Sequence, residues 1–408
     1  MALSRQFLNL IVDNRIPGAI SLRCIDLTRQ HFFNTTTPPQ ALNGSGSESD
    51  GLEDATSWAP AAGAGNQKNN QAGEVASRVE RIQLPSPLFN FRAATMTDRW
   101  AMHCFPLAGR EVLCADQSGR TFLFDADTRH VLTMPDLHKP KKWPLSLFVP
   151  SASVDDHDDS GGTLFIMESL PRPETRCSGQ HSDQFEAFVY RKPTSISFCQ
   201  PLPPPPFVLD PKYRDSRTKI SSYAVIEADG GNQICISVEG AGTYCLHMVN
   251  HTWTHLGDWT LPFRGRVEYV PELKLWFGLC AKTQHLAAAD LSALDSQPEL
   301  METWKELSRH KNWWDSQDSQ LVNLGSGRFC IARFFHTRTL MGYYCDQIVE
   351  NDFAVLTCVD VAPCLRDGNG SASGFANANG SSGKVKLQMI KYKSKFHSSS
   401  DSKIMSVF

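Results

Sequence analysis

The stretch Val112–Leu137, VLCADQSGRTFLFDADTRHVLTMPDL, determines the fold that we expect for this chain. It begins as an apolar strand, turns at Gly119, continues as a second apolar strand to Asp125, and returns as a third strand through His130–Met134. Short apolar strands that are separated by tight polar turns are typical of an antiparallel meander. The stretch therefore predicts one unit of a small antiparallel sheet.

Related hairpins recur along the chain. The segment TYCLHMVNHTWTHLG (residues 243–257) aligns without a gap on TFLFDADTRHVLTMP (residues 121–135), which places His247 on Asp125. Three further strands end in the same way when Arg191, Asp290 and Asp360 are placed on Asp125. Five copies of one hairpin are therefore visible, and His247 and Asp290 are 43 positions apart. That spacing is typical of a four-stranded propeller blade.

The repeat predicts an all-β chain, a β-propeller with six blades of four-stranded antiparallel sheets. Strands that are apolar on both faces, such as Leu275–Cys280, fit sheets that pack on a neighbour at each side. Residues 5–84 would form a further blade, completed by a C-terminal strand at Lys403–Phe408. We expect residues 1–408 to form a single propeller domain. A two-sheet sandwich is the alternative, and it explains the repeat less well.

Two segments lack the large apolar residues that a packed core needs. Residues 36–76 and 367–383 consist mainly of Gly, Ser, Asn and Ala, so they bury too little surface to offset the entropy cost of ordering. We predict that both are disordered insertions within the propeller.

Composition restricts the function classes. The 408 residues carry a formal net charge of −3, which does not favour a nucleic-acid groove. No apolar run approaches the roughly 18 residues of a membrane span. The 12 cysteines are scattered without a CxxC pair, which favours reduced thiols and an intracellular protein, cytoplasmic or nuclear.

Three stretches resemble a known family: FLNLIVDNRIPGAISLRCIDLTR (residues 7–29), CADQSGRTFLFDADTRHVLTMPDLHKPK (residues 114–141), and CISVEGAGTYCL with HTWTHLGDWTLPFRGRVEYVPELKLWFG (residues 235–246 and 251–278). They are similar to a plant family, greatly expanded in grasses, that is known only as a domain of unknown function. That family resembles kelch and F-box-associated propellers, which implies a propeller fold and protein interaction. This chain lacks an F-box-like helical module at its N-terminus. The resemblance supplies no catalytic residue.

The sequence gives only weak evidence for a metal site or a catalytic site. The acidic run Asp155–Asp159 offers oxygen ligands but not the spacing of an EF-hand, so a solvated loop is the better interpretation. His247, His251 and His255 would share one face of a helix, but the local pattern is strand–turn–strand. We therefore predict no catalytic residue, no metal site and no cofactor.

The loop between two predicted strands near residue 310 mixes aromatic and basic side chains, a composition that favours recognition surfaces. The candidate protein-binding residues are Trp304, Lys305, Arg309, Trp313 and Trp314. The alternative is a lid that packs on the edge of a blade.

These observations predict a non-enzymatic, monomeric propeller that binds an unidentified protein through loops at one mouth of the ring, without nucleic acid or membrane. The alternative is an enzyme or small-ligand-binding propeller that uses a polar funnel at the centre of the ring.

Overall fold

The computed structural model describes residues 5–33, 40–43, 79–93, 101–151, 161–172, 182–191, 197–213, 218–228, 231–341, 347–364 and 386–408. In these ranges strands predominate, and the helical elements are the short α1 (Pro206–Leu209) and η3 (Pro211–Tyr213). No helix within the described ranges is long and apolar enough to cross a membrane.

The first three sheets each contain four antiparallel strands. The first has the spatial order β28 (Lys403–Val407), β1 (Phe7–Asp13), β2 (Ala19–Asp26) and β5 (Phe89–Arg92). The second is β6 (Met102–Pro106), β7 (Glu111–Asp116), β8 (Thr121–Asp125) and β9 (Val131–Met134). The third is β10 (Pro144–Pro150), β11 (Gly162–Glu168), β12 (Ser182–Tyr190) and β13 (Phe198–Leu202).

The next two sheets repeat this plan. The fourth is β14 (Ile220–Ala228), β15 (Gly231–Val238), β16 (Gly242–His247) and β17 (Trp253–Gly257). The fifth is β18 (Phe263–Val270), β19 (Leu275–Cys280), β20 (Leu286–Ala289) and β21 (Leu300–Trp304).

The sixth sheet is extended. It contains β23 (Gln320–Gly325), β24 (Arg328–Met341) and β25 (Gln347–Pro363), and its outer position is shared by β26 (Leu387–Lys391) and β27 (Ser394–Ser398). Short strands add to it: β22 (Trp314–Asp315) pairs with β24, β3 (Gln40–Asn43) with β26, and β4 (Val79–Arg81) with β27.

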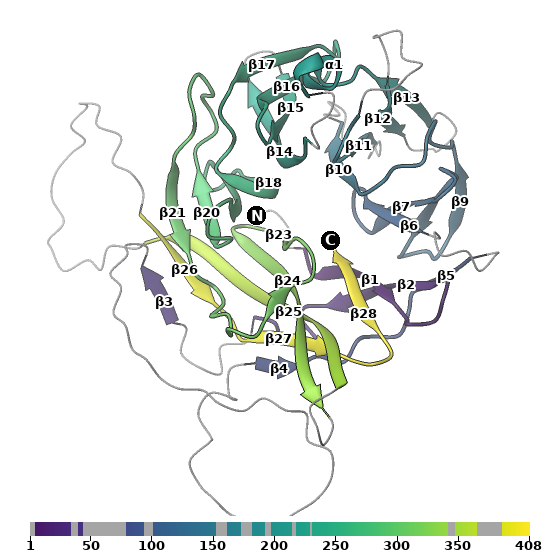
Figure 1. Cartoon of the computed structure of the whole chain (residues 1–408), viewed down its shortest axis with the longest axis vertical. Helices are drawn as coiled ribbons and strands as arrows, with labels where there is room; N and C mark the ends of the chain where they lie inside the picture. The colour runs from purple at the N-terminus through teal and green to yellow at the C-terminus, as the bar shows by residue number, and fades with distance from the viewer. Residues whose placement is uncertain are drawn as a thin grey trace, which may run out of the picture.

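The six sheets lie around a common centre as the blades of a propeller (Figure 1). Their first strands face that centre, and β14 and β18 pair there in parallel, which joins the fourth and fifth sheets. The prediction of an all-β propeller of four-stranded antiparallel sheets is confirmed.

The opening stretch of the sequence forms β7, β8 and β9 as predicted. Gly119 occupies the β7–β8 turn with φ +85°, and a Cβ atom there would lie 3.1 Å from the Leu137 carbonyl oxygen. The turn therefore requires glycine, because other residues rarely adopt this φ.

Six apolar clusters separate the six sheets, one for each pair of neighbours. Strand β7 shows how one strand serves two of them, because successive side chains point to opposite faces. Val112 and Cys114 pack toward the first sheet, and Leu113 and Ala115 pack toward the third. Both faces of each sheet are thereby buried.

The ring closes in the first sheet, where the C-terminal strand β28 pairs with β1. Leu10 lies opposite Val407, and the amide nitrogens of Asn9 and Phe408 donate to each other's carbonyl oxygens at 2.9 and 3.0 Å. Ile404 enters the cluster between the first and sixth sheets. The predicted completion of the first blade by residues 403–408 is confirmed, but its predicted bounds, residues 5–84, are wrong. The fourth strand of this sheet is β5, beyond residue 84, and β4 pairs with β27 of the sixth sheet.

The structure describes little of the two predicted insertions. Within residues 36–76 it describes only β3, which is a strand rather than disordered chain. The rest of this segment and all of residues 367–383 lie outside the described residues, so their disorder stays a prediction. The division of the chain into one domain also stays a prediction.

Strand β28 allows a test of the closure. Ile404 is 2% exposed and its neighbour Met405 is 39% exposed. We expect Ile404→Ala to lower the free energy of unfolding by about 3 kcal/mol, because it leaves a cavity between two sheets. The measurement is urea denaturation followed by tryptophan fluorescence.

Met405→Ala is the matched control on the same strand, and it should change the free energy of unfolding by less than about 0.5 kcal/mol. Equal losses in the two variants would contradict closure through buried contacts of β28.

Candidate protein-binding face

At one edge of the ring lie both turns within a sheet and links between successive sheets. In a four-stranded antiparallel sheet, the turn between the second and third strands lies at the same edge as the link from the fourth strand to the next sheet. We call this edge the connection face. It includes the β1–β2 turn (residues 14–18), the links 135–143, 305–319 and 399–402, and the end of the β24–β25 hairpin.

Trp304, a predicted protein-binding residue, does not belong to this surface. It is the last residue of β21, only 2% of it is exposed, and its ring stacks on Phe277 with centroids 6.4 Å apart. The expectation of an exposed Trp304 is wrong, because residues 300–304 form a strand and the Trp304 side chain lies in the core between the fifth and sixth sheets.

The other four predicted residues lie in the link 305–319. Lys305 and Arg309 are exposed, Trp313 is half-buried, and Trp314 is 43% exposed. The structure therefore brings Arg309, Trp313 and Trp314 together, while Lys305 lies at the start of the link. Their role in binding a protein stays a prediction.

Trp313 anchors the link. Its ring lies 5.1 Å from that of Phe335 and 5.0 Å from that of Phe353, between centroids, on the β24–β25 hairpin. Arg309 Nε donates to the Trp313 carbonyl oxygen at 2.8 Å, and Arg309 Nη1 lies 2.8 Å from Asp315 Oδ2. Trp314 is thereby fixed on the outside, with its ring stacked on His336.

A buried ion pair fixes the beginning of this link. Glu306 is 1% exposed and pairs with Arg333, which also donates from Nη2 to the Gln284 carbonyl oxygen at 2.6 Å. Separation of the two side chains would leave a buried charge uncompensated, which is costly. The pair therefore fixes the position of Glu306 at the start of the link.

A second exposed tryptophan lies in the link 135–143, and sequence reasoning missed it. Trp143 is 73% exposed and has φ +49°, and strand β10 begins directly after it at Pro144. A residue before proline normally adopts an extended conformation, so this left-handed φ is a strained arrangement that the surroundings must impose.

Glu186 holds that link in place. Its side chain is fully buried in β12, where Oε2 accepts from the His138 amide nitrogen at 2.9 Å and from Cys199 Sγ at 3.0 Å. Oε2 also lies 2.8 Å from His138 Nδ1, and the buried Lys141 ammonium contacts Oε1.

This network decides the charge of Glu186. Burial raises the pKa of the carboxyl, but the Lys141 ammonium and the hydrogen bonds from Lys141, Cys199 and the His138 amide outweigh it. The pKa of Glu186 is therefore lowered and the group is a carboxylate at neutral pH. Burial, and after it the charge of the same carboxylate, raises the pKa of the Cys199 thiol, which therefore stays protonated.

His138, Glu186 and Cys199 have ligand atoms within 4.8 Å of one another, a combination that could hold a metal ion. The Lys141 ammonium beside Glu186 disfavours a further cation, and the carboxylate is already saturated by donors. We therefore interpret the cluster as a structural hub. The run Asp155–Asp159 lies outside the described residues.

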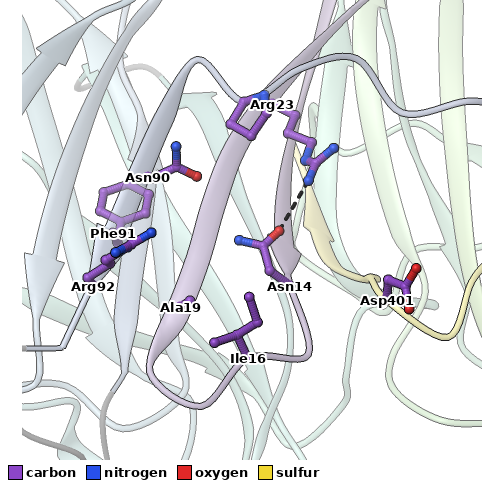
Figure 2. A pocket seen from close by; sticks show the side chains of 9 residues that line it. Asn14, Ile16, Ala19, Arg23, Asn90, Phe91, Arg92 and Asp401 are labelled. Atoms are coloured by element: carbon purple, nitrogen blue, oxygen red, sulfur yellow. Dashed lines mark hydrogen bonds between the residues drawn. The ribbon is translucent and has the colours of Figure 1, made fainter.

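A pocket of about 400 Å³ opens at the β1–β2 turn. Its lining combines two arginines, two amide side chains, an aliphatic residue and one acid, namely Arg23, Arg92, Asn14, Asn90, Ile16 and Asp401 (Figure 2). Ile16 is 61% exposed at the rim. Sequence reasoning missed this pocket because its lining comes from three separate segments.

The pocket and the Trp314 region are connected. Asp352 on the β24–β25 hairpin lies 2.7 Å from Arg15 Nη2 in the β1–β2 turn and 3.1 Å from Lys403 Nζ in β28. Burial raises the pKa of Asp352, but these two cations outweigh it and the pKa is lowered. The hairpin of the sixth sheet is therefore tied to the turn of the first.

One pair of cysteines departs from the sequence prediction. Cys235 and Cys245 lie opposite each other on β15 and β16 with Cα atoms 4.2 Å apart, and the structure joins them in a disulfide. The prediction of reduced thiols is wrong for this pair, because the strand register places the two side chains next to each other. The eight other described cysteines are free.

The two tryptophans near residue 310 should differ in their effect on stability. We expect Trp304→Ala to lower the free energy of unfolding by about 4 kcal/mol, because it removes a buried ring from the core. Trp314→Ala, the matched control, should cost less than about 1 kcal/mol because the ring is partly exposed. Thermal and urea denaturation of both variants provide the measurement, and a larger cost for Trp314→Ala would contradict this assignment.

Substitution of Glu186 should make stability less dependent on pH. The unfolded carboxyl has a pKa near 4.5 and the folded one a lower pKa, so the stabilisation by the carboxylate is complete above pH 4.5 and is lost as the pH falls through the folded pKa. We expect Glu186→Gln to cost about 3 kcal/mol at pH 7, because Lys141 loses its partner, and less at pH 3.5. Urea denaturation at both pH values measures this.

The exposed Glu299 supplies the control. Glu299→Gln should change the free energy of unfolding by less than about 0.5 kcal/mol at either pH. A cost for Glu186→Gln that grows toward low pH would show that the sign of the Glu186 contribution is wrong.

Comparisons with solved structures give weak similarities. The chain is 11% identical to the WD40 domain of SCAP from fission yeast, covering 68% of this chain and 66% of that one, with a TM-score of 0.29. It therefore spans slightly less than two thirds of the SCAP chain. The N-terminal domain of Nup159 is 9% identical, with coverage of 88% and 78% and a TM-score of 0.29. The β-propeller domain of Cps50 (Swd1) from Myceliophteria thermophila is 7% identical, with coverage of 64% and 96% and a TM-score of 0.28.

No curated protein matches this sequence. A family model does match, over residues 5–397, which is nearly the whole chain and includes strands of all six sheets. Its description is a protein of unknown function. The chain therefore belongs to the DUF1668 family.

Proposed function

We propose that this chain is a non-enzymatic protein-interaction module that binds a partner protein through the connection face. One observation carries the proposal: two tryptophans, Trp143 and Trp314, are 73% and 43% exposed on links of the same face. Tryptophan is enriched among the residues that contribute most to protein–protein affinity. Exposed aromatic side chains that the surrounding structure holds in place lose little entropy on binding.

The rigidity of both links supports this role. The Glu186 network holds residues 138–141, and the Glu306–Arg333 pair with the Trp313 cluster holds residues 306–315. Binding residues are commonly found on loops that a rigid scaffold positions. Ile16, at the rim of the pocket, extends the apolar surface toward the first sheet.

The remaining features of the proposal follow from the sequence. We infer an intracellular protein, cytoplasmic or nuclear, that is monomeric and binds no nucleic acid. The net charge of −3 supports the last point, and eight free cysteines against one disulfide among the described residues support the location. The resemblance to kelch and F-box-associated propellers of plants supports protein interaction in the same way. The competing role, an enzyme with a polar central funnel, gains no specific support from the described residues.

Affinity purification from the cells that express the protein tests the proposal. We expect wild-type protein to recover a specific partner, and Trp143→Ala or Trp314→Ala to reduce its recovery about tenfold, the loss that corresponds to one well-packed anchor. The partner is quantified by mass spectrometry under native conditions.

Val249 provides the matched control, because it is 81% exposed in the β16–β17 turn at the opposite edge of the ring. Val249→Ala should leave recovery unchanged. Recovery that is equal in all four proteins, or lost equally with Val249→Ala, would refute binding through the connection face.

A further inference from the structure

Two guanidinium groups in the pocket at the β1–β2 turn have no carboxylate partner in the part of the chain that the structure describes. Arg23 and Arg92 form no ion pair with any residue that the structure describes, although Arg15 in the same turn pairs with Asp352. An isolated charge in a partly buried site is costly, so such a site favours an anion from outside the chain.

Arg23 is half-buried and is held by neutral acceptors alone. Its Nε donates to Ser21 Oγ at 3.2 Å, its Nη1 to the Pro85 carbonyl oxygen at 3.0 Å, and its Nη2 to Asn14 Oδ1 at 3.1 Å. Burial lowers the pKa of Arg23, and no nearby anion reverses this effect. A guanidinium has five N–H groups, so one N–H remains on each terminal nitrogen. This pair matches the two oxygens of a carboxylate.

Arg92 and Asn14 complete the donors around the pocket. Arg92 is exposed at the end of β5, on the opposite wall from Arg23 (Figure 2). Asn14 Oδ1 accepts from both Arg23 and Ser21, which orients its amide nitrogen toward the side of Ala19 and Arg92 (Figure 2). The only acid in the lining, Asp401, is exposed at the rim and accepts from Ser400 Oγ at 2.8 Å. The lining thus carries two positive charges and one negative charge.

We propose that this pocket binds a carboxylate from an acidic segment of the partner protein, with Arg23 and Arg92 as its counter-ions and Asn14 as a neutral donor. This inference rests on the proposed function, because the pocket opens on the same face as Trp314. Asp401 at the rim disfavours groups of higher negative charge, and a single Asp or Glu side chain suits the two-to-one charge balance. Ile16 contacts the apolar part of the same segment.

Fluorescence anisotropy with a labelled decaglutamate peptide tests the site. We expect wild-type protein to bind the peptide, and Arg92→Gln to weaken binding about tenfold through loss of one charged hydrogen-bond partner. Arg92 is the residue of choice because its side chain forms no hydrogen bond or ion pair with the described residues, whereas Arg23 also donates to Pro85 and Asn14.

Arg129→Gln is the matched control. Arg129 is also exposed but lies in the β8–β9 turn at the opposite edge of the ring. Its replacement by Gln changes the net charge by the same amount. Affinity within twofold of wild type is expected. The proposal is overturned if wild-type protein does not bind the peptide, if Arg92→Gln binds as tightly as wild type, or if Arg129→Gln weakens binding equally.

Two competing probes separate the sources of the anion. Acetate should displace the peptide more effectively than inorganic phosphate at equal ionic strength; the reverse order would overturn a carboxylate site in favour of a phosphate site. A labelled decauridylate that binds in an Arg92-dependent manner more tightly than the peptide would overturn it in favour of nucleic acid.

The outcomes distinguish this inference from the proposed function. If partner recovery depends on Trp314 but peptide binding does not depend on Arg92, the pocket inference fails and the interaction module remains. If peptide binding depends on Arg92 and no partner depends on either tryptophan, the proposed role of those tryptophans fails and the carboxylate site remains.

Discussion

The burial of both faces of every sheet is the constraint on which the rest of this structure depends. A sheet that is apolar on both faces would expose both to water if it stood alone, and here each sheet is covered by a neighbour on either side. Six clusters for six sheets require a closed ring, because an open row would leave two outer faces exposed to water. Strand β28 meets this requirement, since it brings the end of the chain into the same sheet as its first strands. Closure is therefore a consequence of apolar burial and not of any single hydrogen bond.

The same constraint separates the scaffold from the surface that can vary. The strands are committed to packing, so polar and exposed aromatic side chains collect on the connections. Where a connection is long, a few buried charges hold it: Glu186 beside Lys141, and Glu306 beside Arg333. Such pairs contribute little net stability compared with apolar residues of the same size. However, they restrict the connection to one conformation, because other conformations would separate the buried charges. This accounts for the left-handed φ of the exposed Trp143 next to a buried network.

The local pattern of the sequence was sufficient for the architecture. The hairpin copies that end at Asp125, Arg191, His247, Asp290 and Asp360 all correspond to the third strand of a sheet or the residue after it. Some of these acids have a local role that recurs: Asp125 Oδ1 accepts from the Asp127 amide nitrogen at 2.8 Å, and Asp290 Oδ1 from that of Ser292 at 2.9 Å. Such turns depend on residues two positions apart, which a sequence displays directly.

Features that depend on distant contacts could not be predicted in this way. The burial of Trp304 requires Phe277 from another strand, and the hub at Glu186 gathers His138 and Cys199 across 48 and 13 positions. The pairing of Cys235 with Cys245 depends on strand register. A shift of the register by one residue would place the two side chains on opposite faces of the sheet. The pocket was the hardest feature to predict, because nothing in the sequence around Arg23 or Arg92 indicates that the two residues line the same site.

The distribution of ion pairs, more than the net charge, indicates where this protein meets a partner. A net charge of −3 suggests no affinity for anions, and arginines such as Arg110 and Arg338 are paired with acids on the chain itself. Charges paired within the chain contribute little to recognition, because their field is cancelled nearby. Among the described residues of the connection face, Arg23 and Arg92 are cations that form no ion pair, and both line one pocket. An overall acidic propeller can therefore present a site that selects an acidic ligand, and the aromatic side chains on the same face supply the apolar contact that a single carboxylate cannot.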